Sequence, residues 1–188
     1  MYVLLAAVVI GGLVVSNLNR SPSRTVHLPT VSGTPDWVST LPFNCLGSAG
    51  LAVGPTSPLA RIDAVRTDTN ARFDRVTIQF TDGAPHDVHL STQQGAKFAE
   101  GASGQTVTLM GQNGALVTLH SADGHTDYSG LTDIKTGYRV VLELRRVQDF
   151  EGTVQWAIGL SQVPCYRMAL MDNPARLVVD FRAGSATT

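Results

Sequence analysis

Few side chains in this sequence have the types and spacing that catalysis requires. Asp149 and Glu151 lie two residues apart, which on a strand places both carboxylates on one face. Glycoside hydrolysis uses a carboxylate pair about 5–10 Å apart across a cleft, but nothing here indicates a cleft, and we interpret the pair as part of a charged turn. Ser48 lacks the first glycine of the G-x-S-x-G elbow, and no His-Glu-x-x-His motif occurs. We therefore expect no catalytic residue.

A hydrolase with an unrecognised motif is the third of three hypotheses for function, after the two binding functions given at the end of this subsection. Turnover lost on changing Asp149 or Glu151 to Ala would favour it.

Metal ligands are also sparse. The loop at residues 123–127 (Asp-Gly-His-Thr-Asp) gathers carboxylates and an imidazole, but it lacks the later bidentate Glu of a calcium loop. His86 and His89 are three residues apart near a strand, so their side chains point to opposite faces. We expect a solvated turn at residues 123–127, no metal site and no cofactor.

Candidate ligand-binding residues fall in two polar segments. Residues 145–152 are the densest polar stretch, and Phe150 lies there among charges, either as a stacking surface or as a cap on the end of the fold. Arg72, Asp74 and Arg75 begin another strand, where structural ion pairing is the simpler interpretation. Arginine suits carboxylate ligands, whereas an aromatic ring with polar neighbours suits a sugar. The candidates for ligand binding are Arg72, Arg75, Arg145, Asp149, Phe150 and Glu151.

The chain has two cysteines, Cys45 and Cys165, which form no C-x-x-C motif and have no His pair at metal spacing beside them. In an exported chain an even number of cysteines favours a disulfide. This one would close a loop of about 120 residues and contribute about 4–5 kcal/mol in the chain-entropy model. The alternative is two unrelated buried thiols.

The elements that must position these residues are strands. Apolar residues alternate with polar ones in four segments, and such alternation marks strands with one buried face. These segments are residues 74–80, 138–146, 153–160 and 176–182. Weaker strands are expected at residues 62–67, 87–90, 106–110, 115–120 and 166–170. Trp156 shares a face with Ile158 and Leu160, so we expect it to pack in the core rather than stack on a ligand.

Turn signals separate these strands. Asn113-Gly114, between residues 106–110 and 115–120, predicts a hairpin. No segment sustains a 3.6-residue period, although residues 94–100 could form a single helical turn. Eight or nine short strands without crossover helices predict an all-β fold, an antiparallel β-sandwich.

Composition changes along the chain. The apolar run at residues 2–15 is too short to span a bilayer comfortably but fits the core of a secretory signal. We expect a signal peptide or membrane anchor at residues 1–18, with a buried N-terminal strand or helix as the alternative; no Cys follows the run to carry a lipid. A Pro/Ser/Thr/Gly-rich linker should occupy residues 19–58, with part of it, 36–50, folded back onto the domain. The β domain then covers residues 59–183, followed by a short tail at 184–188.

Charge limits the range of partners. The apolar content of 43 % is sufficient for one core, and the formal net charge is −1. This balance gives no electrostatic reason to expect binding to nucleic acid or to an anionic membrane surface. We expect contact with a membrane only through the N-terminal segment, and the sequence predicts no oligomeric state.

Five segments recur in this order in a known family: residues 65–67 (VRT), 73–80 (FDRVTIQF), 149–152 (DFEG), 156–160 (WAIGL) and 174–180 (PARLVVD). Together they resemble the AMIN-like domain of exported actinobacterial proteins, including mycobacterial ones. That domain is similar to the AMIN domain of cell-wall amidases and of secretin-type pilus proteins. The resemblance covers about residues 59–183 and implies an exported, non-catalytic β-sandwich. AMIN domains are thought to localise proteins by binding peptidoglycan.

The sequence therefore predicts an exported cell-envelope binding module, on the periplasmic or extracellular side, that contacts peptidoglycan or another wall glycan. The alternative is a protein-interaction domain that docks on an envelope protein complex through an exposed sheet edge.

Overall fold

The computed structural model describes residues 35–45, 47–52 and 59–184. The expected signal peptide or anchor at residues 1–18 lies outside the described residues, as do most of the expected linker and all but the first residue of the expected tail. Within the described residues the chain forms thirteen strands and two short 3₁₀ helices. The prediction of an all-β, mostly antiparallel sandwich is confirmed.

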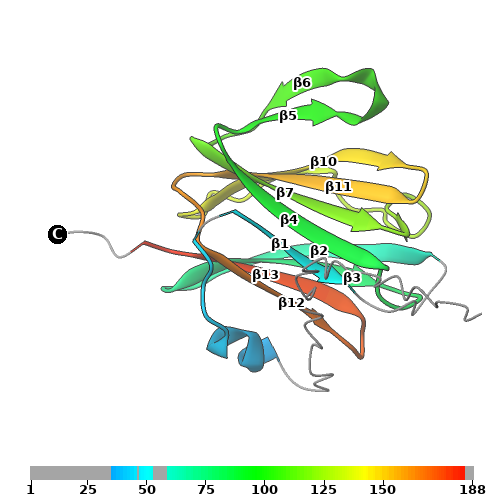
Figure 1. Cartoon of the computed structure of the whole chain (residues 1–188), viewed down its shortest axis with the longest axis horizontal. Helices are drawn as coiled ribbons and strands as arrows, with labels where there is room; N and C mark the ends of the chain where they lie inside the picture. The colour runs from blue at the N-terminus through cyan, green and yellow to red at the C-terminus, as the bar shows by residue number, and fades with distance from the viewer. Residues whose placement is uncertain (1–34, 46, 53–58, 185–188) are drawn as a thin grey trace, which may run out of the picture.

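Two sheets form the body of the molecule (Figure 1). In spatial order, the six-stranded sheet contains β1 (Ser48–Ala52), β4 (Asp87–Gln94), β7 (Asn113–His120), β11 (Thr153–Leu160), β10 (Val141–Phe150) and β9 (Asp133–Lys135). The five-stranded sheet contains β12 (Tyr166–Met171), β13 (Arg176–Arg182), β3 (Phe73–Phe80), β2 (Ala60–Thr69) and β8 (Ala122–Asp123). Every pairing is antiparallel except the short β2–β8 contact, which is parallel.

The apolar faces of the two sheets meet in one core. Val154, Trp156, Ile158 and Leu160 on β11 are 0 % exposed, as their alternation predicts. The inward residues of the five-stranded sheet are equally regular, namely Val76, Ile78 and Phe80 on β3 and Leu177, Val179 and Phe181 on β13. Trp156 is a core residue, and its ring meets Tyr128 edge to face at a centroid distance of 5.9 Å.

Both outer faces of the sandwich carry a cover (Figure 1). The β5–β6 hairpin (Lys97–Glu100 and Gln105–Thr108) lies over the six-stranded sheet, where Phe98 and Leu109 pack in one cluster with Val147 and Ala157. The 3₁₀ helix η1 (Pro35–Thr40) lies over the five-stranded sheet, and the short η2 (Gly101–Ser103) follows β5.

Three local predictions differ from the structure. The predicted Asn113-Gly114 hairpin is wrong, because β6 pairs with β5, and these two residues belong to β7, paired with both β4 and β11. Gly114 is instead required for packing, since a Cβ there would lie 2.5 Å from the Phe98 ring. The predicted helical turn at residues 94–100 is also wrong, because this stretch contains the end of β4 and all of β5. The thirteen strands exceed the eight or nine expected because β1, β5, β8 and β9 have only two to five residues each, too few to show a period.

Residues 35–45 and 47–52, which lie in the expected linker, pack on the domain. Val38 and Leu41 cluster with outward residues of the five-stranded sheet, and β1 pairs with β4 along its whole length. Asn44 forms a backbone bridge with Tyr166, and the adjacent Cys45 is joined to Cys165 by a disulfide. The predicted disulfide is therefore present, and it fixes this segment beside the start of β12.

Candidate functional site

The outer face of the five-stranded sheet contains a buried ion-pair network. Arg75, Asp180 and Arg167 are cross-strand neighbours on β3, β13 and β12. The Asp180 carboxylate is 0 % exposed and accepts hydrogen bonds from Arg75 Nε (2.6 Å) and Nη2 (2.9 Å) and from Arg167 Nε (2.9 Å). Arg167 Nη1 also donates to the backbone oxygens of Ser39 (2.7 Å) and Leu41 (3.1 Å). The network thus attaches η1 to the sheet, and its two cations outnumber its one carboxylate.

Two phenylalanine rings alternate with arginines on this face. The Arg75 guanidinium lies 5.0 Å from the Phe73 ring centroid, and Arg167 lies 4.9 Å from Phe73 and 4.4 Å from Phe43. The Arg182 guanidinium lies 5.7 Å from the centroid of the same Phe43 ring. Cation–π contacts stabilise guanidinium groups that are partly removed from water. The alternating series runs from the middle of the sheet face to its end near the disulfide.

Beside the part of this face that η1 covers lies a polar groove of about 300 Å³. We call it the open groove, and its polar lining consists of Arg66, Asp68, Arg75, Thr77, Gln79 and Arg176. Arg66 Nη1 donates to Gln79 Oε1 (3.0 Å), and Gln79 Nε2 donates to Asp63 Oδ2 (2.9 Å). Arg66 pairs with Thr77 and Asp68 pairs with Arg75 across β2 and β3, so these side chains stand in register on one face of the sheet.

A second hollow of about 440 Å³ lies at the end of the same sheet, and we call it the arginine hollow. Its side chains come from separate segments: Phe43 before the disulfide, Arg72 before β3, Arg139 before β10 and Arg182 at the end of β13. No carboxylate is among its lining residues, all of which the structure describes. Arg139 Nη2 donates to the backbone oxygen of Ala71 (3.1 Å), which connects two walls of the hollow.

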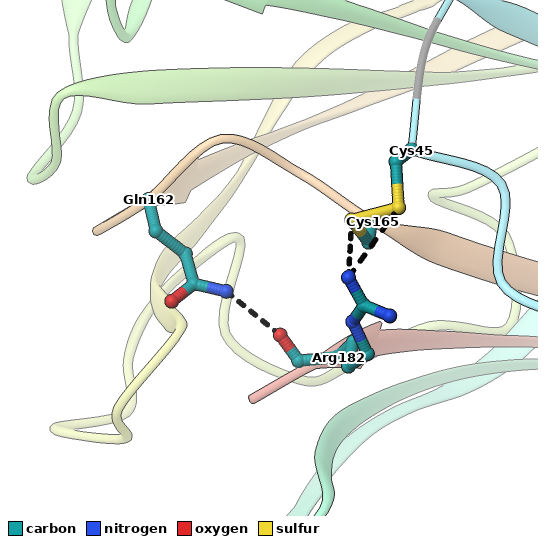
Figure 2. Close-up of a disulfide and its surroundings, with 4 residues drawn as sticks. All are labelled: Cys45, Gln162, Cys165 and Arg182. Atoms are coloured by element: carbon teal, nitrogen blue, oxygen red, sulfur yellow. Dashed lines mark hydrogen bonds between the residues drawn. A yellow bond between two sulfur atoms is a disulfide. The ribbon is translucent and has the colours of Figure 1, made fainter. Parts of the chain in front are cut away.

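The disulfide positions one wall of the arginine hollow. Figure 2 shows Arg182 Nη2 directed at both sulfur atoms, 3.6 Å from Cys45 Sγ and 3.2 Å from Cys165 Sγ. Gln162 Nε2 holds the Arg182 backbone oxygen at 2.8 Å (Figure 2). Arg182 is therefore fixed from two sides while its guanidinium remains at the surface.

The six predicted ligand-binding residues divide between the two sheets. Arg72 lines the arginine hollow and Arg75 lines the open groove, both on the five-stranded sheet. Arg145, Asp149, Phe150 and Glu151 belong to β10 of the six-stranded sheet and the turn that follows it. The structure does not bring these two groups together.

The β10 residues have local partners. Arg145 Nη2 lies 3.3 Å from Glu100 Oε1, and Asp149 Oδ2 lies 3.0 Å from Arg146 Nη1. Phe150 is 61 % exposed at the end of the strand. Glu151 has a φ of 48° in the β10–β11 turn, so it does not continue the strand and does not share a strand face with Asp149. The predicted ion pairing at the start of β3 involves Arg75 with Asp180, whereas Asp74 accepts hydrogen bonds from the backbone nitrogens of Val140 and Val141.

The loop at residues 123–127 forms a compact polar cluster. One ligand atom each of Asp123, His125 and Asp149 lies within 4.8 Å of the others. Arg146 Nη1 contacts the Asp149 carboxylate at 3.0 Å and also donates to the backbone oxygen of Gly124, so a protein cation already faces this cluster. Burial alone raises the pKa of Asp123, but hydrogen bonds from the Thr126 hydroxyl and from backbone N–H groups hold the pKa below its usual value. These contacts account for the cluster as a structural turn.

Sequence reasoning did not identify Phe43, Arg139, Arg182 or the β2 residues of the open groove. A signal existed for the groove, because Arg66 and Asp68 on β2 and Arg75, Thr77 and Gln79 on β3 are polar residues at every second position and therefore share the outward face of each strand. No local signal existed for the arginine hollow, because its four side chains are brought together only by strand order and the disulfide.

The comparison with protein families decides which group this chain belongs to. The model of the AMIN-like domain matches residues 60–183, which is 124 of the 188 residues. The chain belongs to the AMIN-like domain family. No enzyme family matches it, and the AMIN-like domain is typically non-catalytic. No curated protein and no solved structure matches the chain. None of the helices in the described residues has the length and apolarity needed to cross a membrane.

Proposed function

We propose that this chain is an exported, non-catalytic cell-envelope module that binds peptidoglycan or another wall glycan through the outer face of its five-stranded sheet. The observation that carries the proposal is the open groove, a polar groove of about 300 Å³ on an AMIN-like domain. Binding sites of this size need a few well-placed polar groups to fix the orientation of a ligand. Arg66, Asp68, Thr77 and Gln79 offer donors and acceptors of the kind that glycan hydroxyl and amide groups require.

The disulfide supports export. Disulfides persist in oxidising compartments outside the cytosol, and the Cys45–Cys165 bridge joins residues 120 positions apart in the chain. Membership of the AMIN-like family supports association with the cell wall.

The test is retention of the full chain on purified cell wall at low salt. The variant Arg66→Ala/Gln79→Ala removes two groove side chains that carry no core packing, and we expect it to weaken retention about tenfold, as for the loss of one or two hydrogen bonds to a ligand. The control Lys97→Ala removes an exposed charge on the β5–β6 hairpin, which lies over the outer face of the other sheet, and should leave retention unchanged. Failure of the unaltered chain to be retained would refute the proposal.

Phe150 and the charged residues near it are tested in the same assay. Phe150→Ala removes the exposed ring at the end of β10 without touching the groove. If Phe150→Ala abolishes retention while Arg66→Ala/Gln79→Ala does not, the glycan contacts the six-stranded sheet, and the groove proposal is wrong.

A second candidate function is docking on an envelope protein through a sheet edge. β1 ends the six-stranded sheet, and among the described residues its outer edge has no pairing partner. An unpaired edge can accept an added strand from another chain. Capture of an envelope protein, lost when Gly50→Pro is introduced in β1 and combined with no retention on wall, would favour this function over glycan binding.

A further inference from the structure

The arginine hollow has an excess of positive charge that the rest of the molecule does not balance. Arg72, Arg139 and Arg182 line it, and among the described residues none of the three forms an ion pair. Of the seven other arginines that the structure describes, five pair with a carboxylate, namely Arg61, Arg75, Arg145, Arg146 and Arg167. The two exceptions, Arg66 and Arg176, both line the open groove.

Like charges gathered in one concave surface repel one another, and the walls of a hollow strengthen their field. A protein with a formal net charge of −1 has carboxylates to spare, yet none lines this hollow. Repulsion among the three guanidinium groups therefore destabilises the empty hollow, and an anion that enters the hollow relieves this repulsion.

Two of the three arginines are positioned before any ligand arrives. Arg139 is held by its hydrogen bond to the Ala71 backbone oxygen. Arg182 is held by the disulfide sulfurs (Figure 2), and its guanidinium also contacts the Phe43 ring. Arg72 has no side-chain hydrogen bond or ion pair among the described residues, so it is free to close over an entering group. Fixed guanidinium groups lose little rotational freedom on binding, which improves affinity.

We propose that the arginine hollow is an oxyanion site that binds a carboxylate or phosphate group of an envelope polymer. The guanidinium fork matches the two oxygens of either group, and the resulting charge-assisted hydrogen bonds are stronger than neutral ones. The identity of the polymer rests on the proposed function, whereas the affinity for oxyanions does not. Arg72 directly precedes β3 and lies seven positions from the groove residue Gln79 on that strand, or about 23 Å at the strand rise of ~3.3 Å per residue. One extended polymer can therefore occupy the open groove and place an acidic substituent in the hollow.

The first experiment measures oxyanion binding by calorimetric titration of the full, oxidised chain with inorganic phosphate and with citrate. We expect saturable binding that weakens as salt rises. Arg72→Gln and Arg139→Gln should each weaken it about tenfold, as expected for the loss of a charge-assisted hydrogen bond. Lys97→Gln removes a charge of the same sign from the β5–β6 hairpin, which lies over the outer face of the other sheet, and should leave the affinity unchanged. Thermal unfolding of each variant confirms that it is folded. Absence of saturable binding, or equal weakening by Lys97→Gln, would overturn the inference.

The second experiment separates the sources of the oxyanion and the two proposals. Retention of the chain is compared on untreated wall, on wall stripped of phosphate-containing polymers, and on wall whose carboxylates have been converted to amides. Loss of Arg72-dependent retention on the stripped wall assigns a phosphate ligand, and its loss on the amidated wall assigns a carboxylate. If the chain binds phosphate and citrate but is not retained on any of the wall preparations, the oxyanion site stands and the proposed function fails. If the unaltered chain and Arg72→Gln/Arg139→Gln are retained equally on wall, the proposed function stands, and the assignment of the hollow's ligand to a wall polymer is refuted.

Discussion

At the scale of single residues, one buried carboxylate organises the outer face of the five-stranded sheet. Asp180 lies between Arg75 and Arg167, whose side chains are only 12 % and 6 % exposed, and its carboxylate holds both guanidinium groups. A buried ion pair contributes little net stability when it is complete, because desolvation of the charges offsets their attraction. Removing the anion is a different matter, since it leaves two cations facing each other with little water. The network therefore fixes geometry more than it adds stability.

We predict that Asp180→Asn lowers the free energy of unfolding by about 3–5 kcal/mol, the usual cost of removing one partner from a buried pair. Urea unfolding followed by Trp fluorescence measures it. Asp82→Asn is the matched control, because Asp82 pairs with Arg61 on the surface, where both side chains are more than one-third exposed. Exposed pairs of this kind have small effects, so the control should unfold close to the unaltered chain. Equal midpoints for the two variants would contradict the buried network.

At the scale of elements, the segment that follows β6 is pressed directly onto β11. A Cβ on Gly159 would lie 2.0 Å from the Met110 backbone oxygen and 3.0 Å from Leu109 Cβ. The segment cannot simply move away, because Met110 N donates to the nearly buried Glu143 carboxylate at 2.8 Å and Gln112 N donates to the Leu160 backbone oxygen. Only glycine permits this approach of two backbones.

Gly159→Ala should therefore destabilise the domain by about 1–3 kcal/mol through overpacking. The control is Gly50→Ala in β1, where a new Cβ would meet its nearest neighbour at an ordinary 3.8 Å. We expect the control to change stability by no more than about 0.5 kcal/mol. Both changes in the free energy of unfolding are obtained from urea-unfolding midpoints at a constant m-value. A neutral Gly159→Ala would show that residues 109–112 do not hold their position over β11.

Elements also show where sequence patterns succeed and fail. Alternation located β3, β11 and β13 because their inner residues all face one core and no extra residue interrupts these strands. The extra residues in the β2–β3 and β10–β11 ladders lie on β2 and β10 instead. It misplaced β10, because register shifts between Val141 and Glu143 and between Arg146 and Gln148 interrupt the two-residue period. The turn signal at Asn113-Gly114 gave a wrong prediction for another reason. The sequence alone does not distinguish a glycine required for close packing, as Gly114 is, from a glycine required for a turn.

At the scale of the whole molecule, the candidate site depends on long-range connections that no local pattern reveals. Phe43, Arg72, Arg139 and Arg182 are separated by at least 29 positions at each step of the sequence and meet only through strand order. The outward face of β13 was expected to be wet, but Asp180 is fully buried because η1 and residues 39–43 cover it. Sequence could therefore predict the layers of the sandwich and the disulfide, but not which outer surface remains open.

The disulfide is the connection on which this arrangement depends most. Cys45 and Cys165 are 120 positions apart, and their bridge attaches the segment that carries η1, Phe43 and β1 to the start of β12. We predict that Cys45→Ser/Cys165→Ser lowers the free energy of unfolding by about 2–5 kcal/mol and weakens phosphate binding, because Arg182 and Phe43 lose their common anchor. The unaltered chain treated with reductant is the control, and it should match the double variant in urea unfolding and in titration. If reductant changes neither the midpoint nor the affinity, η1 and the arginine network hold the segment without the bridge. The oxyanion site would then be insensitive to the redox state of its compartment.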